Sequence, residues 1–129
     1  MPSKSDIKRY WNHRSEADEQ EALFRWAAWA EAQHPELKLL FHIPNGGKRD
    51  KVTAARLKSQ GVKSGVPDVF LPVARHGKHG LWIELKVPGG SASMNQCQWI
   101  GDLKEQGYDA WICYGWEDAK GVIEAYLEK

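Results

Sequence analysis

The stretch GVPDVFLPVARHGKHGLWIELK, residues 65–86, holds two apolar runs joined by a short linker rich in Gly and His. The runs predict strands over 67–73 and 81–87, and the short linker predicts that the two strands pair as an antiparallel hairpin. Asp68 stands at the head of the first run, and Glu84 and Lys86 lie inside the second. Because charged side chains on buried strands are costly unless paired or bound, these three residues indicate a site.

Outward from this hairpin, hydrophobic periodicity and capping residues predict an α/β fold with the order α-β-α-β-β-α-β-α. It implies a mixed four-stranded sheet flanked by helices, with a parallel crossover from the strand 81–87 to the strand 108–114. The other predicted elements are a helix from Ser15 ending before Pro35, a strand over 38–43, a helix over 51–60 capped by Asp50, a helix from Ser93 to Gly107, and a helix over 117–128.

The 129 residues suit one domain, which we place at 15–129 after a polar arm at 1–14. Hydrophobic residues make up 42% and charged residues 27%, as in a folded globular protein. We find no signal peptide and no membrane-length apolar run, and therefore expect a cytoplasmic protein. Cys97 and Cys113 have no metal-type spacing, so we interpret them as reduced, packed thiols.

Bulk charge does not indicate a nucleic-acid-binding protein, since the formal net charge is +1. Its distribution is more informative, because basic residues gather between 48 and 63 with Asp50 as the only acid among them. Such a patch can bind phosphates, although the solvated face of a helix explains it equally well. The basic residues are Lys48, Arg49, Lys51, Arg56, Lys58 and Lys63.

Side chains alternate across a strand, so Glu84 and Lys86 share one face, roughly 6.5 Å apart along the chain. Trp82 lies on the same face, whereas the spacing of Trp26, Trp29, Trp99 and Trp111 favours the core. In the predicted hairpin Asp68 comes close to the Glu84 end of the neighbouring strand.

Two adjacent carboxylates repel each other unless a cation lies between them, and hard oxygen ligands suit Mg²⁺ or Mn²⁺. The backbone carbonyl of Leu85 is a further candidate ligand. Such a metal activates water and polarises a phosphodiester, and Lys86 can hold that water or balance the charge on the phosphate. The alternative is an exposed strand face carrying a weak Glu–Lys pair.

The P-D…E-x-K pattern resembles the PD-(D/E)XK nuclease superfamily. The resemblance is sharper to the VRR-NUC domain, in its stand-alone, phage-type form, and covers roughly residues 15–127. One departure is Val87-Pro88, where such proteins often carry a basic residue. The stretches that carry the resemblance are IPNGG at 43–47, AARLKSQGVKSGVPD at 54–68, IELK at 83–86 and the helix containing Gln96.

This resemblance implies a restriction-endonuclease-like fold and a metal-dependent DNA endonuclease. Stand-alone forms are associated with four-way (Holliday) junctions and larger relatives with flaps. It implies Asp68 and Glu84 as metal ligands, Lys86 as the catalytic lysine, and a further glutamate ligand from the first helix. Glu16 and Glu19 both remain candidates for that glutamate. Glu16 has a spacing to Gln20 that resembles the family pattern, and Glu19 lies on the inner stripe of the helix.

Gln96 faces the sheet, and the family pattern implies a supporting catalytic role, with a capping box as the alternative. Asn45 precedes two glycines that would let the backbone approach DNA, unless the loop is a plain turn. Basic residues would contact phosphates and position the DNA without reading its sequence. The predicted DNA-binding residues are Asn45, Lys48, Arg49, Arg56, Lys58 and Lys63.

The sequence and this resemblance therefore predict a Mg²⁺- or Mn²⁺-dependent endonuclease that acts on branched DNA. One alternative is a DNA-binding or interaction module on the same fold without catalysis. A phosphate-binding enzyme of another class is not supported, since there is no GxGxxG or Walker loop. Because one small domain offers little surface for gripping a branch, we also expect a homodimer.

Overall fold

The structure, a computed structural model, describes residues 3, 14–44 and 50–129. Its elements confirm the predicted order of helices and strands, with one added 3-10 helix, η1. In chain order they are α2 (Glu16–Ala30), η1 (Pro35–Leu39), β1 (Phe41–His42), α3 (Lys51–Ser59), β2 (Val69–Leu71), β3 (Leu81–Lys86), α4 (Met94–Glu105), β4 (Asp109–Tyr114) and α5 (Trp116–Leu127).

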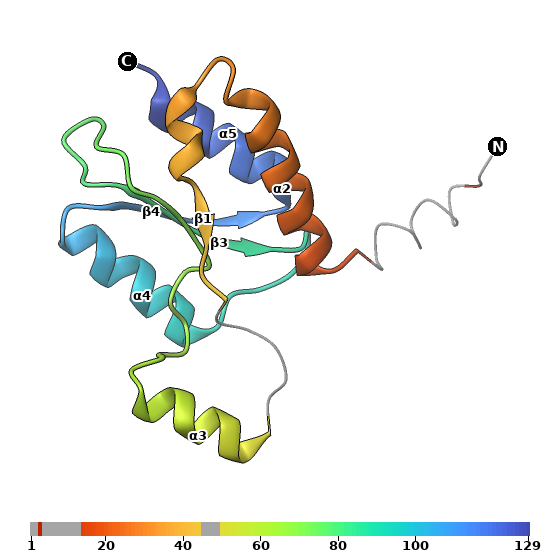
Figure 1. Cartoon of the computed structure of the whole chain (residues 1–129), viewed down its shortest axis with the longest axis vertical. Coiled ribbons are helices and arrows are strands. Elements are labelled where there is room, and N and C mark those ends of the chain that lie inside the picture. The colour runs from red at the N-terminus through yellow and green to blue at the C-terminus, as the bar shows by residue number, and fades with distance from the viewer. Residues whose placement is uncertain (1–2, 4–13, 45–49) are drawn as a thin grey trace.

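The four strands form one mixed sheet in the order β1-β2-β3-β4. β1 pairs antiparallel with β2 and β2 antiparallel with β3, whereas β3 and β4 run parallel. This confirms both the predicted hairpin and the parallel connection through α4. Helices α2 and α5 cover one face of the sheet and α4 covers the other, while α3 stands apart from the layers (Figure 1).

The hydrophobic core lies between the sheet and the α2/α5 layer. Alternate residues of β2 and β3 point into it, including Val69, Ile83 and Leu85, each at most 1% exposed. They pack in one cluster with Leu23 of α2 and Ile123 of α5. The opposite alternation sends Glu84 and Lys86 to the α4 face, as the period of a strand requires.

The predicted helix starts are confirmed in their capping geometry. Ser15 and Asp18 form a reciprocal capping box at α2, and Ser93 and Gln96 form another at α4. The Asp50 carboxylate caps α3 by accepting from the Thr53 N–H at 2.8 Å. These side chains satisfy N–H groups that a helix start leaves without an intrahelical partner.

Several details of the sequence prediction are wrong. The strand expected over 38–43 is reduced to Phe41–His42, because a 3-10 helix that begins at Pro35 runs through Leu39. Trp29 and Trp111, expected in the core, are 73% and 47% exposed. Cys113 is buried as expected, whereas Cys97 is exposed. The local spacing of Trp29, Trp111 and Cys97 was compatible with burial, but no neighbouring element among the described residues covers these positions.

Among the helices that the structure describes, none combines the length and apolar character needed to cross a bilayer.

Candidate active site

Asp68 and Glu84 meet where the β2–β3 hairpin opens. The strands pair Val69 with Ile83 and Phe70 with Trp82, so one further step of this register places Asp68 opposite Glu84. Directly opposed side chains of an antiparallel pair share one face, with Cβ atoms about 5 Å apart. The structure therefore brings together the two carboxylates that the sequence placed on neighbouring strands.

Hydrogen bonds to two neighbouring strands position Asp68. Its Oδ1 accepts from the Leu85 N–H at 3.1 Å, which ties the carboxylate to β3. Its backbone carbonyl accepts from the Ile43 N–H at 2.7 Å and from His42 Nδ1 at 2.9 Å. The Asp68 side-chain oxygen thus serves as the acceptor for the Leu85 N–H in place of a backbone carbonyl.

The environment of the pair favours protonated carboxyl groups. Glu84 is 4% exposed, and burial together with the neighbouring Asp68 charge raises its pKa to about 8, against the opposing effect of Lys86. Burial also raises the pKa of Asp68, although the Leu85 N–H and His42 partly offset this. A positive charge between the two groups would offset the cost of ionising them, since it favours the charged form of both carboxyl groups.

Lys86 and Glu16 complete the charged cluster. Lys86 Nζ lies 3.4 Å from Glu16 Oε1, which brings the start of α2 to the end of β3. The Glu16 charge also contributes to the raised pKa of both Asp68 and Glu84, so its carboxylate faces the same site. The side chain of Glu16 is half exposed.

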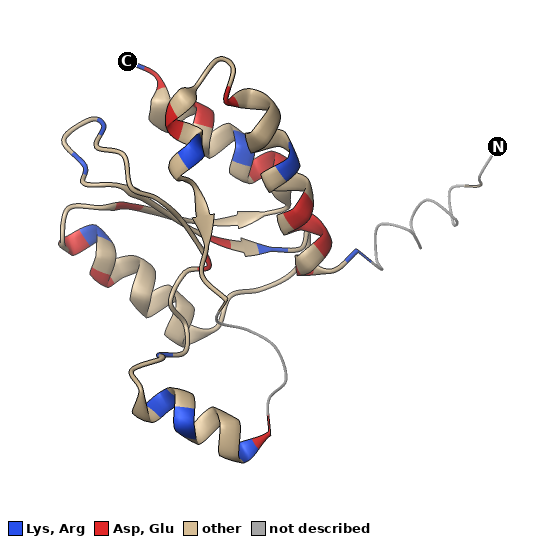
Figure 2. Ribbon diagram, in the orientation of Figure 1, with Lys and Arg blue, Asp and Glu red and all other residues tan. Residues whose placement is uncertain are grey.

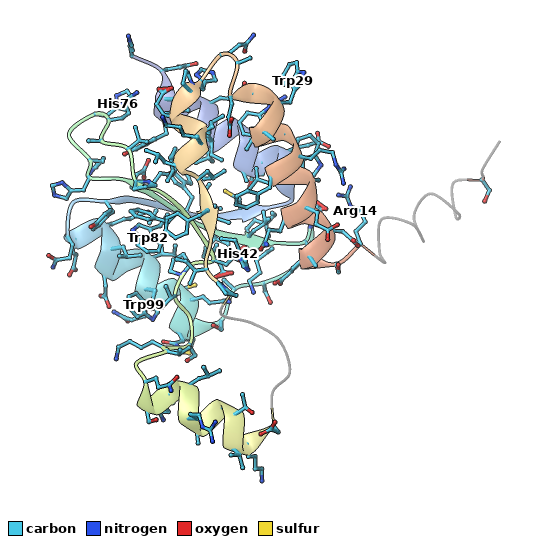
Figure 3. All side chains as sticks on the ribbon, viewed as in Figure 1. Arg14, Trp29, His42, His76, Trp82 and Trp99 are labelled. Carbon is cyan, nitrogen blue, oxygen red and sulfur yellow. The ribbon has the colours of Figure 1, made fainter. Side chains whose placement is uncertain are left out.

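Glu19, the other candidate on α2, is used differently. It is 2% exposed, its Oε1 accepts from the Trp116 N–H at 3.1 Å, and its Oε2 pairs with Arg14 Nε at 2.9 Å. Arg14 lies at the base of α2, beside the sheet end (Figure 3). Both carboxylate oxygens of Glu19 are thus engaged, one by α5 and one by Arg14, whereas Glu16 lies beside Lys86.

The donor set suits a small hard cation whose remaining ligands are waters. In the described part of the chain, no three His, Cys, Asp or Glu side chains form a metal-binding group by themselves. Mg²⁺ is usually held by one or two carboxylates, with waters and substrate oxygens completing its shell. The N–H and C=O of a strand residue point to the same side, so the Leu85 carbonyl also faces Asp68. Asp68, Glu84 and this carbonyl therefore fit such an ion.

Other predicted site residues lie elsewhere or are engaged locally. Gln96 Oε1 accepts from the Ser93 N–H at 2.9 Å, so the capping alternative is realised, with the amide nitrogen still available. Asn45, Lys48 and Arg49 fall outside the described residues. Arg56, Lys58 and Lys63 lie on or just after α3, away from the carboxylates, where basic positions dominate the helix (Figure 2).

His42 is a site residue that sequence reasoning missed. It lies on β1 near the end of the sheet where Asp68 sits, and its Nδ1 donates to the Asp68 carbonyl (Figure 3). With Nδ1 carrying the proton, Nε2 is left as an acceptor. The available signal was a histidine near the end of the apolar run KLLFHI, a predicted strand, but pairing of β1 with β2 was needed to place it.

A mixed sheet with two opposed carboxylates and a lysine at one end is a nuclease-type arrangement. Comparison with known proteins agrees: the model of the VRR-NUC domain family matches residues 5–117. The fold is similar to a solved structure described as a VRR_NUC domain protein, with a TM-score of 0.74, 31% identity and 88% of each chain covered. A search of curated proteins gives no significant match. The chain therefore belongs to the VRR-NUC domain family.

Proposed function

We propose that this protein is a Mg²⁺- or Mn²⁺-dependent endonuclease that hydrolyses phosphodiester bonds in DNA. The observation that carries the proposal is the opposition of Asp68 and Glu84 across the hairpin, with Lys86 next on the same face. Like charges directly opposed across two strands destabilise a sheet, so the presence of this pair favours a role in binding. Membership of a nuclease family supports the same reading.

Asp68, Glu84 and the Leu85 carbonyl would hold the metal, and Glu16 would join them from α2. A bound Mg²⁺ or Mn²⁺ would polarise the scissile phosphate and lower the pKa of a water. Lys86 is positioned to hold the attacking water or to offset charge developing on the phosphate. Its present partner Glu16, at 3.4 Å, keeps the ammonium group at the site. His42 and the Leu85 N–H keep Asp68 in place.

Metal binding can be tested separately from cleavage. Isothermal titration with Mn²⁺ should show binding by the wild-type protein and none by Asp68→Asn, with circular dichroism showing that both are folded. Equal Mn²⁺ affinity in the two proteins would contradict the assigned ligand set. Binding of Mn²⁺ should also raise the melting temperature of the wild type only, because a ligand that binds the folded state alone stabilises it.

Cleavage is tested with end-labelled four-way junction, flap, nicked and linear DNA in Mg²⁺ and in Mn²⁺. We expect the wild-type protein to cut the branched substrates and the Lys86→Ala variant to lose this cleavage. Lys86→Arg retains the charge but not the compact ammonium group, and should therefore restore only part of the rate. If folded protein at high concentration leaves every substrate intact, the domain is a binding module without catalysis.

We further propose that the active form on branched DNA is a homodimer. Extension of the sheet through β4 is not the contact that we expect, because the chain's own carboxylates occupy two backbone donors of that edge. The Ala110 N–H donates to Asp109 and the Tyr114 N–H to Asp118, each at 3.0 Å. Sedimentation across a concentration series is the direct test. A monomer that still cuts junctions at full rate would overturn the dimer.

A further inference from the structure

A cleft of about 610 Å³ separates α3 from α4, outside the carboxylate site. Apolar groups and one aromatic ring form its walls, with two lysines among them and, in the described residues that line it, no acidic side chain. A cleft of this size accommodates a small planar ligand. Its lining comprises Ala54, Leu57, Lys58, Gly61, Val62, Lys63, Ser64, Asn95 and Trp99.

Two hydrogen bonds hold the α4 wall of this cleft to Ser64. Asn95 Nδ2 donates to the Ser64 carbonyl at 2.8 Å, and Trp99 Nε1 donates to the same oxygen at 3.1 Å. Gly65 has a φ of +88°, and a Cβ there would lie 2.8 Å from Asn95 and 3.0 Å from Trp99, so only glycine permits this approach. Trp99 therefore lines the cleft with its indole N–H already engaged.

The α3 wall of the cleft, in contrast, is exposed and basic. α3 has nine residues and buries none of them, although Val62, 39% exposed, follows it at the cleft. Helices this short are marginal without tertiary packing, which indicates a missing partner. The Asp50 charge at its start is engaged by Thr53 through its N–H and its hydroxyl, at 2.8 and 2.9 Å. The exposed surface of α3 is therefore basic, as Figure 2 shows.

We propose that this cleft receives one unpaired nucleobase of the DNA, stacked on Trp99, with the flanking phosphates on Lys58 and Lys63. Stacking on an aromatic ring beside a basic groove is how proteins hold single strands without reading their sequence. The two lysines and the lack of an acidic side chain among the described lining residues favour a negatively charged partner over a basic or neutral one, and the aromatic ring favours a nucleobase. The inference rests on the proposed endonuclease function and gives it a preference for DNA with unpaired nucleotides.

The position of the cleft relative to the carboxylates limits where cleavage occurs. Ser64 and Asp68 are four residues apart, so their Cα atoms are separated by at most about 14 Å. Successive nucleotides of a duplex strand rise about 3.4 Å. The scissile phosphate should therefore lie within about four nucleotides of the captured base.

The experiment measures binding without divalent cations, so that no cleavage intervenes. Two duplexes of equal length are compared, one fully paired and one with a single unpaired 2-aminopurine, whose fluorescence is quenched by stacking on an indole ring. Wild-type protein should quench the unpaired base and bind that duplex more tightly. Trp99→Leu should lose the quenching and about ten-fold in affinity for the unpaired duplex. Trp29→Leu, at an exposed tryptophan on α2, is the matched control and should change neither.

Val62→Glu provides a variant with little risk to folding, since it places a carboxylate at the partly exposed rim of the cleft. It should weaken binding of the unpaired duplex more than of the paired one. Equal losses on both duplexes, or unchanged quenching in Trp99→Leu, would overturn the proposal. Unchanged DNA affinity with altered sedimentation of Val62→Glu would assign the cleft to a second copy of the chain, and would also overturn it.

These results are independent of whether the protein cuts DNA. Quenching that depends on Trp99 without cleavage under any condition would refute the nuclease proposal and support the cleft. Cleavage by the wild type, with equal rates and positions on DNA with and without an unpaired nucleotide, would support the nuclease and overturn the cleft.

Discussion

The Leu85 backbone N–H donates a 3.1 Å hydrogen bond to Oδ1 of Asp68, so a side chain takes the place of a backbone partner just before β2 begins. This contact holds the Asp68 carboxylate against β3, beside Glu84 and on the side to which the Leu85 carbonyl points. One hydrogen bond thus links Asp68 to the strand that carries Glu84 and Leu85.

Replacement of Glu84 by Gln should have opposite effects on activity and on stability. The neutral amide keeps the shape but removes a buried charge that faces Asp68, so the free energy of unfolding without metal should rise at pH 8. Loss of a proposed metal ligand should lower the cleavage rate by at least about 100-fold. Urea unfolding and a junction-cleavage assay measure the two. A variant that is less stable and fully active would contradict this account.

Stability should also depend on pH through Glu84. Its pKa rises from an ordinary 4.5 to about 8 in the folded protein, so the folded state binds more protons than the unfolded state between these values. Stability therefore falls as pH rises from about 4.5 to 8. Chemical unfolding in EDTA across this range should show a steeper fall for the wild type than for Glu84→Gln. Parallel curves would show that Glu84 does not titrate as described.

Replacement of Glu16 or of Glu19 by Ala should affect stability and Mn²⁺ binding differently. Glu19→Ala leaves Arg14 without its buried partner and should lower the free energy of unfolding by about 3 kcal/mol, with Mn²⁺ affinity unchanged. Glu16→Ala removes an exposed side chain and should weaken Mn²⁺ binding while leaving the melting temperature almost unchanged. Calorimetry and thermal unfolding of both variants decide the assignment, and the reverse pattern would make Glu19 the ligand.

His42 should act as a positioning residue for Asp68. His42→Ala removes the Nδ1 donor to the Asp68 carbonyl and should reduce metal affinity about ten-fold, in the range seen when groups that orient ligands are lost. His42→Asn places an amide donor near the Nδ1 position and should restore part of the affinity. No rescue by Asn, together with a large loss of cleavage at saturating metal, would assign the imidazole a direct role in the reaction.

The salt dependence of DNA binding should report on the basic residues near α3. Lys58→Ala and Lys63→Ala should each weaken binding of every DNA and reduce the slope of log affinity against log salt by about one. Lys120→Ala, on α5, is a control with the same change of charge and should leave the slope unaltered. Equal slopes in all these proteins would exclude phosphate contacts near α3.

By itself the sequence determined the elements, their order and the two acids and lysine at the head of the hairpin. These follow from local rules: capping boxes at Ser15 and Ser93, the two-residue period of LWIELK, and a short linker that allows only an antiparallel hairpin. Errors arose where local pattern and burial disagree. Leu39 and Trp29 fit apolar patterns, but no element of the described structure covers them.

Only tertiary structure decided which groups gather around Asp68. Glu16 and Glu19 are the same residue type and lie three residues apart on one helix, yet one contacts Lys86 and the other joins α2 to α5. His42 reaches Asp68 through pairing of β1 with β2, and the Trp99 cleft forms through contacts between residues 31 or more positions apart. Such contacts depend on how the layers pack, because register and packing bring together residues that local sequence leaves unrelated.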